Sequence, residues 1–496
     1  MDKLFKLMFM LFLLFDYNLI YAQSTFSKII SNTDDQVINQ ICEDTEGNFV
    51  LVGRIKNDKT ETSKGYILKI DRTGSSYEEN IIQPIDTCSY IFFNIHFYNN
   101  RFYLLGSQMI HFYNKCKLWY LKLDIDLNVE SEKTLGLPGN KWFSYMNSII
   151  DSDTNIVLTG YTTRLDTNQN GGTFYNNDAF FYKLDLYGDS ITSSFYNSEN
   201  PWHFSFDIIE NRDCSQYYAF VSHFTNIFGT SGQKLILNKS LDSLSIDSIP
   251  LQVFDFYSPT YISQDEILIC GKRGEEPPND YALNALTITE SSMLSNYNIF
   301  KKDTFREHPA LYRGTSKHQD NIYISATTNF DYINPFYSTN DSWFHLIKIN
   351  PDITPKWEYW YGGDAYYQLY SIIATSDGGC LMVGNRYDYE FQDQERDVYV
   401  LKVDSSGLVV WTQEIQTDKI LYDLYPNPGE NQIHIKTTSE EHELELYNLD
   451  GQILIKQRLR STSNTLNTES LPSGLYIYRF FDKEQKFIRT GKWIKK

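Results

Sequence analysis

The sequence predicts an all-β fold: a seven-bladed β-propeller followed by a small immunoglobulin-like β-sandwich. Three observations support this prediction. Aromatic residues make up 16% of the 496 residues, with 38 Tyr and 32 Phe, and such side chains favour strands. A strand–turn–strand pattern recurs every 50 to 61 residues through most of the chain. Near residue 416 this pattern gives way to a second kind of strand-rich sequence.

The first 22 residues have the pattern of a signal peptide. Lys3 and Lys6 give a short positive end, and 7–15 is an unbroken apolar run of nine residues. A helix that spans a bilayer takes about 20 apolar residues, so this run is too short to do so. Ala22 offers the small residue that a signal peptidase requires, which places cleavage between Ala22 and Gln23. We expect no transmembrane segment in the mature chain.

Each repeat contains three recognisable strands. In the first copy these are 37–41, then 49–53 after an Asp/Gly/Asn turn, and 66–71, whose form is aromatic-x-Leu-Lys-x-Asp. The second strand ends at residues 53, 106, 160, 221, 271, 326 and 384 in the successive copies, mostly with Gly. Repeats of this length with turn residues between strands predict four-stranded antiparallel blades over residues 24–416. A linear solenoid seldom uses all-strand units of this size.

The fourth strand of the last blade has two candidates. The run 408–413 follows the seventh Leu-Lys-x-Asp motif, and 26–30 precedes the first copy as an extra strand that would close the ring. The sequence leaves open which of them pairs with the last third strand.

The repeats resemble the Asp-Gly-Gly propeller repeats of exported proteins of the Bacteroidetes type. The match is carried by 375–379, followed by Val-Tyr-Val-Leu-Lys-Val-Asp at 398–404, and it is strong in the first and last copies. The resemblance implies a scaffold that binds or presents surfaces, and it names no ligand.

The chain ends in a different kind of strand-rich sequence. After a linker at 417–421, residues 422–496 contain Tyr-Pro-Asn-Pro at 425–428, Asp-Gly at 450–451, Leu-Pro-Ser-Gly-Leu-Tyr at 471–476 and Gly-Lys-Trp-Ile-Lys-Lys at 491–496. Turns at these points predict a sandwich of about seven strands.

In order and spacing these motifs resemble the type A C-terminal sorting domain of the type IX secretion system. The resemblance implies export to the periplasm and then passage through an outer-membrane translocon. It further implies removal of the domain by a sortase-like peptidase, with the product secreted or attached to the outer surface. The motif residues would serve recognition or folding; the alternative is that the glycines and prolines only shape turns. They are Pro426, Asn427, Pro428, Gly451, Gly474, Tyr476 and Lys492.

Charge and motif content limit the possible functions. A net charge of −19 repels phosphate backbones, so we expect no nucleic-acid binding. The His and Cys spacings predict no metal or other cofactor, although a disulfide between Cys88 and Cys116 stays open. The run 151–155 imitates the start of a calcium loop, but Ile156 and Thr162 stand where Gly and Glu are needed.

Three functions are compatible with this sequence. The first is a binding or adhesion module for a glycan or a protein, with specificity in the inserts Asp166–Asp178 and Asn329–Asp341. The second is a glycan-degrading hydrolase or lyase in the propeller channel, and the third is a structural surface-layer protein. No catalytic motif is present, so we expect a protein that is not an enzyme. The aromatic run 357–361 would stack on sugars or pack between blades.

Overall fold

The chain divides into two compact units, Met1–Val409, here called the ring unit, and Val410–Lys496, the C-terminal unit. The computed structural model describes residues 23–496 except 58–61, 83–87, 111–114, 137–141, 168–172, 197–201, 226–228, 251–252, 254–257, 274–280, 303, 391–394, 410–422, 427, 437–441, 449–451, 462 and 482–486. The described residues form strands and turns and contain no α-helix. Accordingly, none of them belongs to a helix able to cross a bilayer.

The ring unit consists of 29 described strands. They are β1 (Phe26–Ile30), β2 (Asp35–Glu43), β3 (Phe49–Lys56), β4 (Lys64–Ile70), β5 (Tyr77–Ile82), β6 (Ser89–Tyr98), β7 (Arg101–Ile110), β8 (Lys115–Leu123), β9 (Val129–Gly136), β10 (Trp142–Ile150), β11 (Ile156–Thr167), β12 (Thr173–Leu184), β13 (Ser190–Tyr196), β14 (Trp202–Glu210), β15 (Gln216–Thr225), β16 (Gly229–Asn238), β17 (Ser243–Ser248), β18 (Thr260–Tyr261), β19 (Glu266–Arg273), β20 (Ala282–Thr289), β21 (Leu294–Phe300), β22 (Glu307–Pro309), β23 (Thr315–His318), β24 (Asn321–Thr328), β25 (Trp343–Ile349), β26 (Pro355–Gly362), β27 (Tyr366–Ala374), β28 (Cys380–Tyr387) and β29 (Asp397–Val403).

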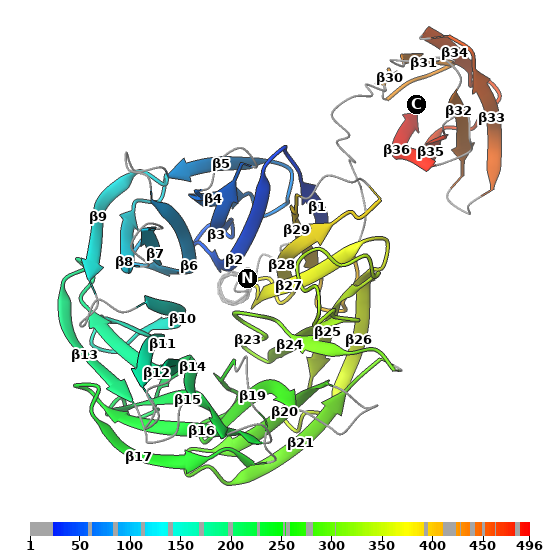
Figure 1. Cartoon of the computed structure of the whole chain (residues 1–496). Helices are drawn as coiled ribbons and strands as arrows, with labels where there is room; N and C mark the ends of the chain where they lie inside the picture. The colour runs from blue at the N-terminus through cyan, green and yellow to red at the C-terminus, as the bar shows by residue number, and fades with distance from the viewer. Residues whose placement is uncertain are drawn as a thin grey trace, which may run out of the picture. The chain divides into compact units, whose positions relative to one another are not determined.

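These strands pair as antiparallel meanders of four, which confirms the predicted all-β class. The sheets are β2–β5, β6–β9, β10–β13, β14–β17, β18–β21, β22–β26 and β27–β29 with β1. One parallel contact, Asn177 with Trp202, joins the β10–β13 and β14–β17 sheets, and β22 and β23 together form one broken inner strand. The sheets follow one another around a ring, with β2, β6, β10, β23 and β27 nearest its centre (Figure 1).

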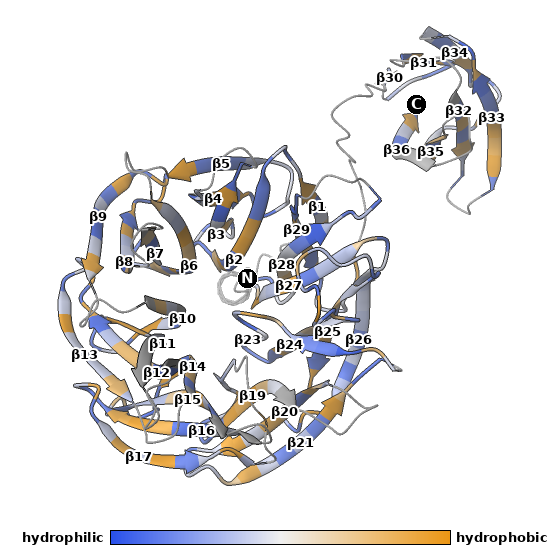
Figure 2. Cartoon of the chain, in the orientation of Figure 1, coloured by the Kyte–Doolittle hydropathy of each residue, from blue (hydrophilic) through white to orange (hydrophobic). Residues whose placement is uncertain are grey.

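Apolar residues are buried between neighbouring sheets. Alternation along β3 directs Val50 and Val52 to a cluster with Phe92 and Trp119 of the next sheet, because successive side chains of a strand point to opposite faces. The other face of β3 packs in a cluster with Leu381 of the preceding sheet. The outermost strands are more exposed, and β13, β17 and β21 mix polar and apolar residues in Figure 2.

The extra N-terminal strand completes the last sheet. β1 pairs antiparallel with β29, with Phe26 opposite Lys402 and Ile30 opposite Val398. Phe26 and Ile30 are buried in the cluster shared with the β2–β5 sheet. Of the rival candidate 408–413, residues 408 and 409 form no strand and the rest lie outside the described residues. Thus the first strand of the ring unit pairs with its last one.

A shared bulge explains the glycine that ends many second strands. In β2, β6, β10 and β27 one extra residue interrupts the pairing with the next strand. The bulge brings an inner-strand carbonyl so close that a Cβ on Gly53 or Gly384 would collide with it. Glycine is therefore required where the backbones approach most closely.

The C-terminal unit contains two sheets. One has the order β30–β31–β34 and the other β33–β32–β35–β36. Their buried side chains form a single cluster that includes Leu444, Phe480 and Trp493. The strands are β30 (Asp423–Tyr425), β31 (Gln432–Lys436), β32 (His442–Tyr447), β33 (Ile453–Leu459), β34 (Ser463–Asn467), β35 (Gly474–Phe481) and β36 (Phe487–Lys495).

Candidate functional site

The motif residues of the C-terminal unit gather partly around Trp493. The Pro426 carbonyl accepts a hydrogen bond from Trp493 Nε1 at 2.9 Å. The Tyr476 ring lies 5.8 Å from that of Trp493, and its hydroxyl donates to Pro472 O at 2.5 Å. Pro426 and Tyr476 therefore contribute to the fold of this unit.

The other motif residues lie elsewhere. Gly474 begins β35, while Pro428 and Lys492 are exposed. Lys495, which the motif analysis did not single out, is buried and donates from Nζ to the carbonyls of Thr468 and Glu469, at 2.5 and 3.1 Å. Asn427 and Gly451 lie outside the described residues.

The signal-peptide prediction also lies outside the described residues, because residues 1–22, with Ala22, are among those not described. Gln23 is described and contacts the last sheet. Its Nε2 donates to Asp377 O at 2.7 Å, and its Oε1 accepts from Ser405 N at 2.9 Å.

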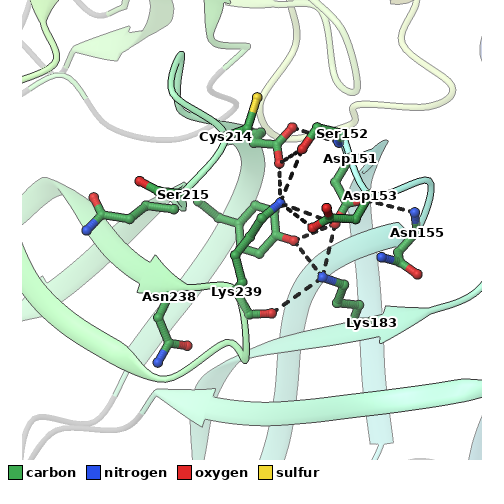
Figure 3. A network of polar contacts seen from close by, with 12 residues as sticks. Asp151, Ser152, Asp153, Asn155, Lys183, Cys214, Ser215, Asn238 and Lys239 are labelled. Atoms are coloured by element: carbon green, nitrogen blue, oxygen red, sulfur yellow. Dashed lines mark hydrogen bonds and ion pairs between the residues drawn. The ribbon is translucent and has the colours of Figure 1, made fainter.

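In two divergent copies of the repeat, the lysine at the position of the Leu-Lys-x-Asp motif joins neighbouring sheets; these copies read Tyr-Lys-Leu-Asp at 182–185 and Ile-Lys-Ile-Asn at 347–350. Lys183 Nζ on β12 lies 3.1 Å from Asp151 Oδ2 in the turn of its own sheet. It also donates to Tyr217 OH at 2.9 Å and to Lys239 O at 3.4 Å, both in the next sheet (Figure 3). Lys348 reaches Ser405 O of the following sheet in the same way, at 2.8 Å. Lys183 and Lys348 are thus structural.

This network also accounts for the calcium-like run 151–155. Asp151 accepts from Asn155 N at 2.8 Å and from Tyr217 OH at 2.5 Å, and Lys239 Nζ lies 3.7 Å away. Lysine ammonium groups occupy the place where a cation would bind. Among the described residues no group of three or more His, Cys, Asp or Glu side chains is placed to hold a metal.

The aromatic run 357–361 packs between sheets. Trp357 Nε1 donates to Ser405 O at 3.1 Å and Tyr361 OH to Gly407 O at 2.8 Å, both in the next sheet. Trp360 points to the other face, where its ring stacks on His345 with 4.7 Å between centroids. Of the two predicted roles, the contacts favour packing over sugar stacking.

The two predicted specificity inserts differ in structure. The insert Asp166–Asp178 is mostly a hairpin, because β11 continues to Thr167 and β12 begins at Thr173. The prediction of a separate insert was therefore wrong for most of this segment, because the two strands continue into it. Their extensions are mostly polar and show little of the apolar alternation from which strands are predicted. Asn329–Asp341, in contrast, is an ordered loop; it is here called the recognition loop only because the sequence predicted specificity there.

Hydrogen bonds hold the recognition loop in shape. Asn329 Nδ2 donates to Asp341 O at 2.7 Å and bridges the ends of the loop. The Asp331 carboxylate accepts from Ile333 N at 2.9 Å, Asn334 N at 3.1 Å and Ser338 Oγ at 2.8 Å. Above this frame the Ile333 side chain is 92% exposed and Phe336 45% exposed. The loop therefore presents two apolar side chains from a fixed backbone.

A buried ion pair supports the loop from below. The Arg396 guanidinium lies 5.1 Å from the Phe336 ring centroid and 5.2 Å from that of Tyr337. Arg396 in turn forms a bidentate pair with Asp35 on β2, at 2.7 and 2.8 Å. The guanidinium thus connects the loop to β2, the inner strand of the first sheet.

A histidine between two carboxylates lies beside the loop. His345 Nδ1 is 3.3 Å from Glu307 Oε2, and His345 Nε2 is 2.7 Å from Glu358 Oε1. Burial acts against the charged imidazole, but hydrogen bonds and the charges of both carboxylates outweigh it and raise the pKa of His345. Tyr332 OH of the loop donates to Glu307 O at 3.2 Å. The side chains of His345 and Glu307 are fully buried and that of Glu358 is 28% exposed, so this cluster lies largely inside the protein, where it supports the loop.

The centre of the ring unit contains a segment that the sequence did not indicate. The five residues Ala310–Gly314 separate β22 from β23 where other inner strands have a one-residue bulge. Arg313 forms a parallel bridge with Ser371 of β27. The Tyr312 carbonyl accepts from Asn147 Nδ2 of β10 at 3.4 Å. This axial insert thus reaches strands well away from its own sheet.

Buried polar side chains surround the axial insert. One comes from each of five inner strands directly after the bulge, and we call them the axial layer: Gln40, Asn94, Asn147, Asp207 and Ser371. Asn94 Nδ2 donates to Asn147 Oδ1, and Ser371 Oγ donates to Gln40 Oε1 at 2.9 Å. Hydrogen bonds thus join two pairs of side chains within this layer.

The cysteines give no disulfide. Cys88 and Cys116 are both free, as are the other four cysteines. Burial raises the pKa of the Cys116 thiol to about 11, which makes it unreactive at neutral pH.

Among the comparisons with known proteins, one family model matches the C-terminal unit. Residues 423–496 match the family described as "Secretion system C-terminal sorting domain". No curated protein matches the sequence.

Several solved structures resemble the chain at low identity. They include a fungal alcohol oxidase of the AA5 family in complex with copper, with 10% identity, a TM-score of 0.44, and coverage of 95% of this chain and 98% of that one. The β-propeller domain of the trilobed protease of Pyrococcus furiosus has 9% identity, a TM-score of 0.42, and coverage of 78% and 100%. A puromycin-hydrolysing peptidase of Mycobacterium tuberculosis has 8% identity, a TM-score of 0.47, and coverage of 83% and 60%.

These TM-scores lie below 0.5, so the propeller-like fold rests on the strand pairing of the chain itself. The family match indicates that residues 423–496 are similar to a domain that directs proteins to the type IX secretion machinery. The chain therefore has the features of an exported protein with a propeller-like unit ahead of a sorting domain.

Proposed function

We propose that the chain is an exported binding protein whose recognition loop contacts a protein ligand. On this proposal residues 1–22 are the signal peptide, 24–416 form a seven-bladed propeller, 417–421 a linker and 422–496 an immunoglobulin-like sorting domain. The type IX translocon and its sortase-like peptidase would handle that domain, leaving the propeller secreted or attached to the outer surface.

The exposed side chain of Ile333 on a hydrogen-bonded loop carries this proposal. Its 92% exposure on a backbone fixed by Asp331 and Asn329 supports binding with little loss of conformational entropy. An apolar contact of this kind fits a protein surface better than a glycan. The aromatic run 357–361 supports the same choice, because Trp357, Trp360 and Tyr361 are engaged in packing.

The binding test uses fluorescently labelled mature chain and cells of the producing strain that lack the gene. We expect saturable binding that protease treatment of the cells abolishes and periodate treatment leaves intact. Ile333→Asp should weaken binding at least tenfold. Met293→Asp, at a side chain that is 68% exposed elsewhere in the ring unit, is the matched control and should have no effect.

Binding that survives Ile333→Asp would refute the role of the recognition loop. Periodate sensitivity would point to a glycan, and turnover of a polysaccharide in a parallel hydrolase screen would establish the enzyme alternative. Export is tested separately: deletion of 423–496 should leave the protein in the periplasm, and normal secretion of the truncated chain would refute the sorting assignment.

A further inference from the structure

The four-stranded sheet of the C-terminal unit has a core face and a face that points to solvent. Tyr476 and Trp493 lie on the core face, in the buried cluster of that unit. Because successive side chains of a strand point to opposite faces, the residues next to them along β35 and β36 lie on the other face, which we call the outer face. The register of the four strands shows which side chains meet there.

Apolar side chains cross the outer face from one edge of the sheet to the other. Directly paired residues of β33, β32, β35 and β36 form one row, which ends in a lysine: Ile453, Tyr447, Ile477 and Lys492. In the next row Leu475 lies opposite Ile494. The Cβ atoms of paired residues are about 5 Å apart, so these side chains are within reach of one another. We call the following set the apolar band: Ile453, Tyr447, Ile477, Leu475 and Ile494.

The apolar band is open to solvent, whereas the core face of the same sheet is covered. Ile453 is 51% exposed and Ile494 45%. On the core face Trp493 and Tyr476 are buried, and Trp493 Nε1 donates to the Pro426 carbonyl within the unit. The side chains that hold this unit together are therefore not available to a partner, and those of the apolar band are. A contiguous apolar surface of this kind is typical of an interaction site.

The charged side chains of the outer face have a net positive charge. By register, four basic and two acidic residues of the described part of the sheet lie on it: Lys456, Arg458, Arg479, Lys492, Glu443 and Glu445. Lys456 Nζ donates to Glu445 Oε1 at 2.8 Å. The Arg479 guanidinium lies 5.1 Å from the ring centroid of Tyr447 in the apolar band. A positive face on a chain of net charge −19 favours a partner with acidic groups.

We propose that the apolar band is the surface through which the C-terminal unit binds a protein of the type IX secretion machinery, one that offers an apolar surface bordered by acidic groups. This inference rests on the proposed export function. The family match of residues 423–496 points to that partner, because the band lies within the matched domain. Ile453 and Ile494 belong to paired strands, so their burial costs little backbone freedom. The charges around the band set the orientation of the partner.

An export assay with the full-length chain in the producing strain tests the proposal. Ile453→Asp and Ile494→Asp, combined in one variant, should lower the amount of protein outside the cell at least tenfold, with the remainder in the periplasm. Leu244→Asp, at a side chain that is 53% exposed on β17 of the ring unit, is the matched control and should be exported like the wild type. Deletion of 423–496 gives the full block for comparison.

This assay separates the inference from the proposed function. Normal export of the double variant, together with a block by the deletion, would reject the apolar band as the docking surface and leave the sorting assignment intact. Normal export of the deletion variant would reject the sorting assignment itself, and with it this inference.

Photocrosslinking decides the case in which the double variant does not fold and is lost to periplasmic proteases. Benzoylphenylalanine in place of Ile453, in the otherwise unchanged chain, should crosslink to a protein of the export machinery that mass spectrometry identifies. The same substitution at Leu244 should not give this product. No crosslink from position 453, or a crosslink only between two copies of the chain, would overturn the proposal.

Discussion

Truncation of Ile30 to alanine should loosen the pairing between β1 and β29, whereas the same change at the neighbouring Ile29 should have little effect. Ile30 is 2% exposed and packs in the cluster shared with the next sheet, and Ile29 is 47% exposed. Removal of three buried carbons costs roughly 2.5 kcal/mol in transfer free energy, and the cavity raises this to about 2–4 kcal/mol. Both variants lose the same β-propensity, so their difference isolates burial.

Hydrogen exchange measured by mass spectrometry reads out this difference. For Ile30→Ala, exchange in peptides covering β1 and β29 should accelerate by roughly 30- to 700-fold, because each 1.4 kcal/mol is a factor of ten. For Ile29→Ala the acceleration should stay below about tenfold. Peptides from β15 and β16, far along the chain, serve as the internal reference. Equal acceleration in both variants, or none in β29, would show that β1 does not complete the last sheet.

Three further predictions concern charged groups. The fold stabilises the protonated form of His345, so this residue contributes fully to stability below about pH 6.5, and the contribution declines as pH rises through the raised pKa. The thermal midpoint should therefore fall across that pH range in the wild type but not in His345→Gln. Parallel pH profiles of the two proteins would contradict this. Lys183→Met should cost about 2–3 kcal/mol, because Lys239, 3.7 Å away, then remains as the cationic partner of the buried Asp151 carboxylate, whereas the more exposed Lys239→Met should cost less. The test is the thermal midpoint, and the reverse order would refute the structural role of Lys183. Lys495→Ala should accelerate hydrogen exchange in β35 and β36, since it removes the donor to two turn carbonyls. Lys492→Ala, at an exposed position, should not accelerate exchange there, and equal effects of the two substitutions would contradict the prediction.

The repeat pattern predicted much of the ring unit because its signals are local. Turn residues and apolar alternation lie within a few residues of each other in every copy, so four-stranded antiparallel sheets followed directly. The repeated glycine reflects a backbone contact within one hairpin, as at Gly53. Phe26–Ile30 was recognisable as a strand for the same reason, although its partner β29 is more than 360 residues away.

The features that the sequence did not reveal depend on contacts between distant segments. His345 meets Glu307 across 38 residues and Glu358 across 13, and no spacing rule predicts such a triad. The axial insert lies in a weak copy of the repeat, where Ala310–Gly314 has the sequence of an ordinary turn. The segment 166–178 is mostly polar, with Phe174 and Tyr175 next to each other, so it shows no apolar alternation from which strands can be predicted.

The pairing of β1 with β29 sets an order of events during synthesis and export. Contacts within each meander join residues a few dozen positions apart, so individual sheets can form while the chain is still emerging. The last sheet, in contrast, lacks its outer strand until 398–402 meet 26–30. Circularisation is therefore a late step, which waits until nearly the whole ring unit has been released.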